Sequence, residues 1–246
     1  MRIIGVIPAR YKSSRLEGKP LADIHGKSMV QHVYECAMRS TCLDEVVVAT
    51  DDQRIFRVVE SFGAKVVMTS VDHRSGTDRV AEAVRGMDAD VIVNIQGDEP
   101  MLDPAMLAEV VDPFRSGASP DVVTLKKRVT HESEFADPGV VKVVTDPAGY
   151  ALYFSRSLIP YPRQRTARFA VFEHLGLYAY TRSALMRLAG LPSSELEEIE
   201  SLEQLRALEN GIRILVIETA SRREMLSVDT QADLERAREL MGEVNV

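Results

Sequence analysis

The sequence predicts a doubly wound α/β fold with a mostly parallel sheet. Short apolar runs rich in Val and Ile alternate with segments whose apolar residues recur every three or four positions. The apolar runs are continuous rather than alternating, which is typical of parallel strands covered on both faces. Alternation of such runs with helical patterns indicates βαβ units. The expected strands are residues 3–7, 45–49, 65–68, 91–95 and 122–125.

Helical patterns lie between these strands. Residues 29–39 and 53–62 each place apolar side chains on one face, and Gly63 follows the second as a C-cap signal. Residues 77–85 predict a third helix. Residues 104–114 predict a fourth, with a proline in its first turn.

The second half of the chain has a different pattern. Residues 140–144 and 151–154 flank a turn of Asp, Pro and Gly, which predicts a β-hairpin. Residues 163–169 are basic and are expected to form a loop. Further strands are expected at residues 174–180 and 213–218.

Two helices are expected toward the end of the chain. Residues 194–210 are rich in Glu and Leu and predict one long helix that ends before a glycine. Residues 230–241 predict the last helix, with Thr230 as N-cap and Asp233 completing a capping box. Since the chain shows no repeat, low-complexity tract or linker, we expect one domain with an inserted subregion.

Composition excludes several classes of protein. The chain has 246 residues, with 30 Lys and Arg against 37 Asp and Glu, and a net charge of −7. An acidic chain is not a general nucleic-acid coat, although a local basic pocket can still hold a small anion.

Cys36 and Cys42 fit no metal-ligand spacing and are expected to be reduced thiols of a cytosolic protein. No apolar run predicts a signal peptide or a membrane span.

The loop that follows the first expected strand is cationic. It runs from Arg10 to Lys19 and also contains Lys12 and Arg15, against the acidic background of the chain. Guanidinium and ammonium groups in a Gly- and Ser-containing loop beyond a strand are suited to phosphate oxygens. The alternative is a basic surface loop, because the sequence matches neither a Walker motif nor a dinucleotide fingerprint.

Two aspartates are candidate metal ligands. Asp98 follows the expected strand 91–95, and Asp229 precedes the last helix. Two carboxylates from distant segments can share one Mg²⁺ and leave its other positions for phosphate, substrate and water. The alternatives are that Asp98 begins a turn and that Asp229 helps to cap the helix, where Thr230 already offers a cap.

Three other places carry chemistry less specifically. Residues 75–79 allow close backbone approach, but Thr77 can simply cap the following helix. His174 begins an expected strand, and a lone histidine is more often structural. Glu203 lies in the expected long helix, whose charged face is by default solvated.

The motifs form an ordered set, namely Ile7–Tyr11, Ser14–Leu16, Gly18–Leu21, Ser75–Arg79, Asn94–Pro100, Tyr153–Arg156, His174–Tyr178, Leu202–Arg206 and Val228–Thr230. In this order they resemble the 3-deoxy-manno-octulosonate (Kdo) cytidylyltransferase family, the CMP-Kdo synthetases. Each motif alone is weak, whereas the set is specific and covers nearly the whole chain. The sialic-acid cytidylyltransferases share the loop design but lack the Tyr-x-Ser-Ser-Arg-Leu-x-Gly-Lys-Pro-Leu form that begins at Tyr11.

The resemblance implies a nucleotidyltransferase (Rossmann-like) fold in one domain over residues 1–246. A sugar-binding and dimerisation subregion is implied over residues 140–215. The implied protein is a cytoplasmic homodimer that uses Mg²⁺ and binds neither nucleic acid nor a membrane. The implied reaction joins CTP and Kdo into CMP-Kdo and pyrophosphate for lipopolysaccharide biosynthesis. In this reaction the anomeric hydroxyl attacks the α-phosphorus in line.

The resemblance also implies a role for individual residues. The implied catalytic set is Arg10, Arg15, Lys19, Asp98 and Asp229. Its cations hold the triphosphate and offset the charge of the departing pyrophosphate, and its two aspartates bind the metal. The implied nucleotide-binding residues are Pro8, Ala9, Arg10, Arg15, Lys19, Ser75, Gly76 and Thr77. The implied sugar-binding residues are Gln96, Arg156, His174, Glu203 and Gln204.

Two departures from the family pattern keep alternatives open. Glu17 stands where the family usually has Pro, and Ser227 stands where it often has Gly. Glu17 is expected either to face solvent or to pair with a cation of the loop. A related substrate such as 8-amino-Kdo or another 2-keto sugar acid is one alternative. A catalytically silent nucleotide sensor is another, although the candidate metal carboxylates and the cations are all retained.

Overall fold

A computed structural model describes residues 1–12, 15–73, 75–118, 120–164, 169–223 and 225–243. It divides into two compact units. Unit 1 contains Met1–Ala108 and Ser221–Val246, and unit 2 contains Glu109–Ala220. The subregion expected over residues 140–215 lies within the range of unit 2. The single-domain description of the whole chain stays a prediction.

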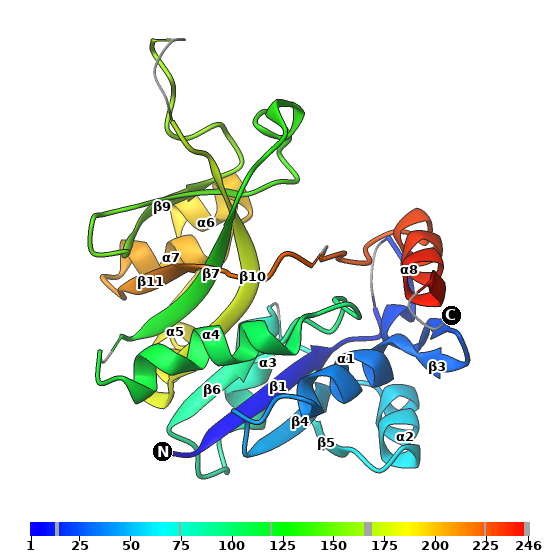
Figure 1. Cartoon of the computed structure of the whole chain (residues 1–246). Coiled ribbons are helices and arrows are strands. Elements are labelled where there is room, and N and C mark those ends of the chain that lie inside the picture. The colour runs from blue at the N-terminus through cyan, green and yellow to red at the C-terminus, as the bar shows by residue number, and fades with distance from the viewer. Residues whose placement is uncertain (13–14, 74, 119, 165–168, 224, 244–246) are drawn as a thin grey trace. The chain divides into compact units, whose positions relative to one another are not determined.

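Unit 1 is built on a parallel sheet. Its strands are β1 (Ile3–Ala9), β4 (Glu45–Thr50), β5 (Lys65–Met68) and β6 (Val91–Asn94). They lie in the order β6-β1-β4-β5, and every neighbouring pair is parallel (Figure 1). The four strands coincide with four of the predicted apolar runs, which confirms the α/β prediction.

The helices of unit 1 explain why the sheet is doubly wound. Three of these helices cover the sheet, namely α1 (Met29–Met38), α2 (Gln53–Ser61) and α3 (Gly76–Ala83). The chain steps outward from β1 to β5 and then returns to β6 on the other side of β1. Because such crossovers are right-handed, α1 and α2 cover one face and α3 covers the other. The direction reverses between β1 and β6, and ligands of open α/β sheets bind at such a point.

The C-terminal part of unit 1 packs beside the start of the chain. The helix α8 (Gln231–Glu243) lies near the short hairpin of β2 (Asp23–Ile24) and β3 (Lys27–Ser28) (Figure 1). The buried residues that join them are Ile24, Met29, Val228, Leu234 and Ala237. The predicted capping box is confirmed, since the Asp233 N–H donates to Thr230 Oγ1 at 3.2 Å and the Thr230 N–H donates to Asp233 Oδ2 at 2.8 Å.

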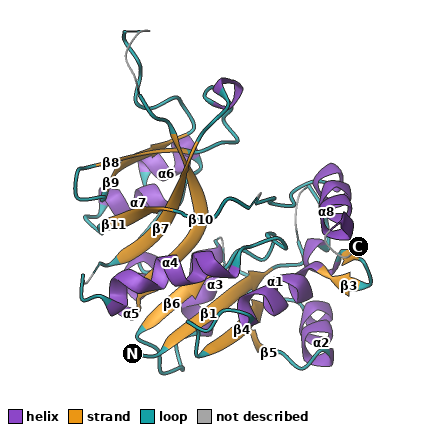
Figure 2. Cartoon of the chain, viewed as in Figure 1, coloured by secondary structure: helices purple, strands orange, loops and turns teal. Residues whose placement is uncertain are grey.

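Unit 2 contains a mixed sheet. Strand β7 (Val122–Arg128) pairs antiparallel with β10 (Phe172–Thr181) and parallel with β11 (Ile214–Glu218), as Figure 2 shows. Strands β8 (Lys142–Thr145) and β9 (Ala151–Ser155) form the predicted hairpin. The helix α4 (Pro104–Arg115) begins at the predicted proline and contains the boundary between the ranges of the two units.

The long helix expected over residues 194–210 is wrong. Two short helices replace it, α6 (Glu195–Glu200) and α7 (Gln204–Glu209). Ser201 between them is left-handed, with φ 52° and ψ 48°. The carbonyls of Glu200 and Ser201 accept hydrogen bonds from the Arg156 guanidinium, so a distant side chain satisfies this helix end.

Four short elements were not expected from the sequence. They are the helix α5 (Arg182–Ala189), the 3₁₀ turns at Lys19–Leu21 and Glu132–Glu134, and the β2–β3 hairpin. Residues 165–168 of the expected basic loop lie outside the described residues. Cys36 and Cys42 are buried free thiols, as predicted. No described helix combines the length and the apolarity needed to cross a membrane.

Candidate functional site

The loop after β1 closes on itself and presents Lys19. Gly18 is buried and left-handed, with φ 68°, and its N–H donates to the Tyr11 carbonyl at 3.0 Å. A Cβ atom at position 18 would lie 3.1 Å from the Tyr11 ring, so the turn requires glycine. The Arg54 guanidinium stacks 3.2 Å above the centre of the same ring. The turn leads directly into the 3₁₀ helix that begins at Lys19.

The two predicted metal carboxylates meet at this lysine. Lys19 Nζ donates to Asp98 Oδ2 at 2.7 Å and to Asp229 Oδ1 at 3.1 Å. Arg15 Nη2 lies 3.0 Å from the same Asp229 oxygen. The Lys19 side chain is 14% exposed, against 25% for Asp98 and 35% for Asp229. Unit 1 therefore brings together four of the five residues of the implied catalytic set in one cluster of balanced charge.

Backbone contacts hold the two aspartates in place. The Val228 N–H donates to the Asp98 carbonyl at 2.9 Å, which joins the β6 loop to the segment before α8. The Asp229 N–H donates to Asp233 Oδ2 at 3.1 Å. The capping box of α8 therefore fixes the backbone that carries Asp229, while the Asp229 carboxylate contacts Lys19 and Arg15. The role of Asp229 as a metal ligand stays a prediction.

Pro8 lies between two glycines of the site. A Cβ atom at Gly76 would lie 3.5 Å from the Pro8 ring, so the start of α3 approaches the end of β1. A Cβ atom at Gly97 would lie 2.6 Å from the Pro8 carbonyl oxygen. Pro8 and Gly76, both implied nucleotide-binding residues, are thus adjacent, and the backbone that leads to Asp98 passes directly against them.

Gly97→Ala should destabilise the protein. The new methyl group would press on a backbone oxygen, which can move only with β1, so we expect a loss of about 1–3 kcal/mol in the free energy of unfolding. Urea denaturation measures this loss. Gly86→Ala is the matched control, because its Cβ would meet no atom within 4 Å. Equal stability of the two variants would contradict the close approach.

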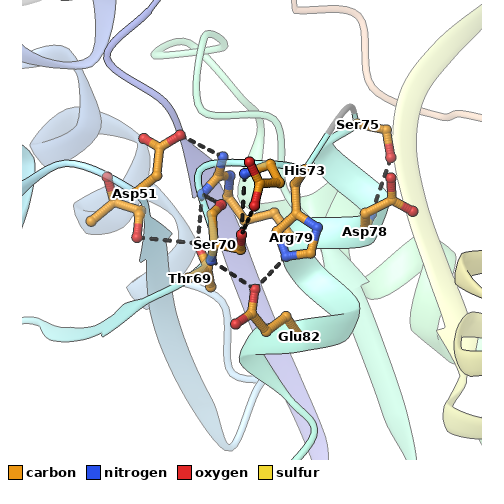
Figure 3. Close-up of polar contacts among 10 residues, drawn as sticks. Asp51, Thr69, Ser70, His73, Ser75, Asp78, Arg79 and Glu82 are labelled. Carbon is orange, nitrogen blue, oxygen red and sulfur yellow. Dashed lines mark hydrogen bonds and ion pairs between the residues drawn. The ribbon is translucent and has the colours of Figure 1, made fainter.

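The start of α3 is fixed by a polar network (Figure 3). Ser75 Oγ accepts from the Asp78 N–H at 3.1 Å, so Ser75 caps the helix and the expectation that Thr77 does so is wrong. Thr77 lies one residue inside the helix and is buried. The buried Arg79 donates from Nη2 to Asp51 Oδ2 at 2.7 Å and from Nη1 to Thr69 Oγ1 at 2.5 Å. Arg79 thereby ties α3 to the ends of β4 and β5.

Other predicted residues of unit 1 lie as follows. Arg10 is exposed at the end of β1 and has no ion-pair partner among the described residues, whereas Ala9 is buried. Glu17 is also exposed, and no described cation pairs with it, which favours the first of its two expected settings. Ser227 is exposed.

Gln96 is half-buried in the loop before Asp98. Ser13 and Ser14 lie outside the described residues.

The other four implied sugar-binding residues belong to unit 2. His174 Nε2 lies 3.0 Å from the buried Thr124 hydroxyl, whose one hydrogen is directed at the carbonyls of Leu177 at 2.8 Å and Leu175 at 3.1 Å. The hydroxyl has a single hydrogen, so it accepts from Nε2–H and leaves Nδ1 as an acceptor. The ring packs 4.9 Å from the centre of Phe154. Burial lowers the His174 pKa to about 3, so the imidazole is neutral at physiological pH.

We expect the His174 ring to show no titration between pH 5 and pH 8, which NMR of the imidazole C–H resonances can follow. The unfolded chain binds this proton near the ordinary pKa of 6.5, and the folded protein does not until about 3. Stability therefore falls as the pH drops below 6.5. His174→Gln should lack this contribution, and a His174 titration near 6.5 in the folded protein would contradict it.

Glu203 and Gln204 follow the break between α6 and α7. Gln204 is 9% exposed, and its Nε2 has no hydrogen-bond partner in the described structure. An unpaired buried donor is costly unless a ligand completes it. Glu203 Oε1 accepts from Arg206 Nη2 at 3.0 Å, and Arg206 also pairs with Glu197 at 3.3 Å. The buried Arg206 therefore orients Glu203.

Arg156 is half-buried and already bonded. Its Nε, Nη1 and Nη2 atoms donate to the carbonyls of Glu200, Pro138 and Ser201 at 2.7, 2.8 and 3.3 Å. A guanidinium has five N–H groups, so two remain for a ligand. Arg156 thus uses three of its five N–H groups on backbone carbonyls.

Sequence reasoning missed three buried cations that hold these segments. They are Arg79, Lys142 and Arg206, with exposed fractions of 3%, 0% and 5%. A charged residue on a helical or strand pattern is by default assigned to solvent. Their position in the sequence could have indicated a structural role, because Arg79 and Arg206 each end one of the motifs of the ordered set.

The cluster around Lys19 also fits a divalent cation. Asp98 Oδ2 and Asp229 Oδ1 converge on one positively charged atom, as they would on a metal ion. Among the described residues, no group of three or more His, Cys, Asp and Glu is arranged as a metal site. Mg²⁺ in phosphate-transfer sites commonly takes one or two carboxylates together with phosphate oxygens and water.

Comparison with known proteins gives close relatives over nearly the full length. Residues 4–214 match the cytidylyltransferase family model. The chain is 51% identical over 251 residues to a 3-deoxy-manno-octulosonate cytidylyltransferase of Trichlorobacter lovleyi, covering 98% of this chain and 99% of that one. It is 54% identical over 241 residues to the protein of the same name in Solibacter usitatus, covering 97% and 94%.

Solved structures agree with these relatives. The structure of CMP:2-keto-3-deoxy-manno-octonic acid synthetase complexed with CTP has a TM-score of 0.94 and 46% identity, covering 99% of this chain and 100% of that chain. A 4-diphosphocytidyl-2C-methyl-D-erythritol synthase of Anaerococcus prevotii has a TM-score of 0.62 at 12% identity, covering 98% and 99%, and shows the shared fold alone.

Proposed function

Because this chain belongs to the 3-deoxy-manno-octulosonate cytidylyltransferase family, we propose that it transfers CMP from CTP to the anomeric hydroxyl of Kdo and releases pyrophosphate. The protein is therefore a nucleotidyltransferase. The observation that carries the proposal is the cluster of Lys19, Arg15, Asp98 and Asp229 at the switch point of a parallel sheet. Cations that suit a triphosphate meet there with carboxylates that suit a divalent ion.

The cations of the β1 loop act on the triphosphate. Arg10 is exposed and unpaired among the described residues, so its guanidinium can grip phosphate oxygens bidentately. Arg15 and Lys19 exchange Asp229 and Asp98 for phosphate oxygens. Negative charge grows on the β-phosphate as pyrophosphate leaves, and fixed cations at that point stabilise the transition state.

Backbone supplies the rest of the nucleotide site. The segments Pro8–Arg10 and Ser75–Thr77 are adjacent through Pro8 and Gly76, and they hold the cytidine. Ser75, Arg79 and their partners fix the second segment before the ligand arrives. Such preorganisation lowers the entropy lost when two substrates are aligned for reaction.

Asp98 and Asp229 would hold Mg²⁺. When bound, the metal neutralises phosphate charge and lowers the pKa of the attacking hydroxyl. In the transfer, the anomeric oxygen bonds to the α-phosphorus and gives up its proton to solvent water. The bond from that phosphorus to the pyrophosphate oxygen breaks, and pyrophosphate leaves with the electron pair.

The sugar-binding role of unit 2 rests on its unsatisfied polar atoms. The buried Gln204 Nε2 offers a donor, and the neutral His174 offers Nδ1 as an acceptor for a hydroxyl. Glu203 and Arg156 belong to the same unit, and Gln96 of unit 1 stays a predicted sugar-binding residue. The homodimer and the cytoplasmic location stay predictions, the first of which light scattering can check.

The experiment that tests the function offers CTP and Mg²⁺ with either Kdo or 8-amino-Kdo. We expect pyrophosphate release and CMP-Kdo formation, with the larger kcat/KM for Kdo. A larger value for 8-amino-Kdo would instead select the alternative substrate. CTP binding without turnover on any 2-keto sugar acid would reject the enzyme and leave a nucleotide sensor.

A further inference from the structure

Lys142 is a buried cation to which the proposed reaction gives no role. It begins β8, and its side chain is fully buried. Its ammonium donates to the carbonyls of Asp137 at 2.6 Å, Val140 at 2.8 Å and Arg156 at 2.9 Å. An ammonium has three hydrogens, and all of them are used on backbone. Burial lowers the pKa of Lys142, so the site tolerates the charge only through these bonds.

Lys142 and Arg156 belong to one hydrogen-bond network. The two cations both bind the 137–140 loop, Lys142 through Asp137 and Val140 and Arg156 through Pro138. Lys142 also holds the carbonyl of Arg156 itself. Lys142 therefore fixes both the carbonyl of Arg156 and the 137–140 loop to which the Arg156 side chain binds.

Arg156 in turn holds the break between α6 and α7. Its Nε and Nη2 atoms bind the last carbonyls of α6, at Glu200 and Ser201. The Glu200 carboxylate returns two contacts, accepting from Ser155 Oγ at 2.6 Å and from the Arg156 N–H at 2.9 Å. The left-handed backbone of a non-glycine residue such as Ser201 is strained, and these contacts compensate for that strain and keep the break.

The break sets where the sugar-binding candidates lie. Glu203 and Gln204 come two and three residues after Ser201. If Ser201 were helical, α6 and α7 would form one continuous helix, and the side chains of Glu203 and Gln204 would point in other directions. We infer that Lys142 is a positioning residue for the sugar acid, acting through Arg156 and the α6–α7 break on Glu203 and Gln204. The inference rests on the proposed function.

The first test is Lys142→Met, with Lys127→Met as the control. Methionine keeps the apolar stem and removes the charge, whereas Lys127 is 42% exposed on strand β7 of the same unit. We expect Lys142→Met to raise the KM for Kdo on the order of tenfold, since small misplacements of binding groups have effects of at least this size. The KM for CTP should change less than twofold.

A second variant decides the matter if Lys142→Met does not fold. Glu200→Gln weakens the contacts of the Glu200 carboxylate with Ser155 and Arg156. Glu198→Gln is its control, because Glu198 is exposed on the same helix. Glu200→Gln should also raise the KM for Kdo selectively. Amide hydrogen exchange over residues 195–209 should become faster in Lys142→Met and Glu200→Gln and stay unchanged in both controls.

The outcomes separate this inference from the proposed function. A wild-type protein that does not turn over CTP and Kdo rejects the function. An active wild type whose Lys142→Met and Glu200→Gln variants keep the KM for Kdo overturns the positioning role. A lower kcat with both KM values unchanged also overturns it, because that result reports only less folded enzyme.

Discussion

Replacing Asp98 by asparagine should lower kcat by about 10²- to 10³-fold, the effect of losing one electrostatic contact made to a transition state. Asparagine keeps the size of the side chain and an oxygen that can accept from Lys19, but it loses the negative charge. The Asp98 carbonyl still accepts from the Val228 N–H, so the loop should keep its shape. Pyrophosphate release under saturating CTP and Kdo measures the loss.

CTP binding separates this effect from a damaged nucleotide site. Calorimetry should give a CTP affinity for Asp98→Asn within a few-fold of the wild type, because the phosphate-binding cations and the α3 segment are untouched. Asp88→Asn is the control, since Asp88 is an exposed aspartate of the same unit. A kcat within threefold of the wild type would remove Asp98 from the catalytic set.

Replacing Lys19 by methionine should have opposite effects on two measurements. Turnover should fall about 10²- to 10³-fold, because the cation that offsets the charge of the leaving pyrophosphate is gone. Binding of Mn²⁺ in the absence of nucleotide should become tighter, on the order of tenfold. The reason is that Lys19 Nζ lies 2.7 Å and 3.1 Å from the two carboxylates, and a divalent ion must displace it.

Titration of free Mn²⁺ by electron paramagnetic resonance measures the second effect without any turnover. Lys27→Met serves as the control, since Lys27 is exposed and pairs with Glu35 instead. Weaker or unchanged Mn²⁺ binding in Lys19→Met would mean that the lysine and the metal do not compete. It would also place the metal away from the Asp98–Asp229 pair.

The sequence predicted the parallel sheet well for a physical reason. Strands such as residues 91–94 are buried on both faces, so nearly every position must be apolar and the pattern is visible in the chain itself. The C-terminal capping box was predictable for a similar reason, because Thr230 and Asp233 contact each other locally. Local rules suffice where the partner is within a few residues.

Predictions failed where the partner is distant in sequence. The break after Glu200 depends on Arg156, 44 residues away, and nothing in the Glu- and Leu-rich segment announces it. The cap of α3 was assigned to Thr77 although Ser75 offers the same chemistry two residues earlier, a choice that depends on the backbone angle at residue 75. The burial of Lys142 could not be foreseen, since the 137–140 loop supplies two of its carbonyls and Arg156 supplies the third only in the folded protein.

The proposed catalytic cluster was predictable only in part. The chemistry of Lys19, Asp98 and Asp229 was readable from residue type and from position beyond strand ends, and the resemblance to a family gave them roles. Their convergence on one nitrogen atom was not readable, because it requires the chain to return to unit 1 after residue 220.

The return of the chain to unit 1 sets the order in which the residues of the cluster are synthesised. Domains fold largely as units while the chain emerges from its N-terminus. Lys19 and Asp98 are synthesised early, whereas Asp229 and the rest of the C-terminal part of unit 1 are added only after all of unit 2 has been made. A chain that ends before residue 229 therefore contains Lys19 and Asp98 but lacks the second carboxylate of the cluster, and it gains that carboxylate only when synthesis is nearly finished.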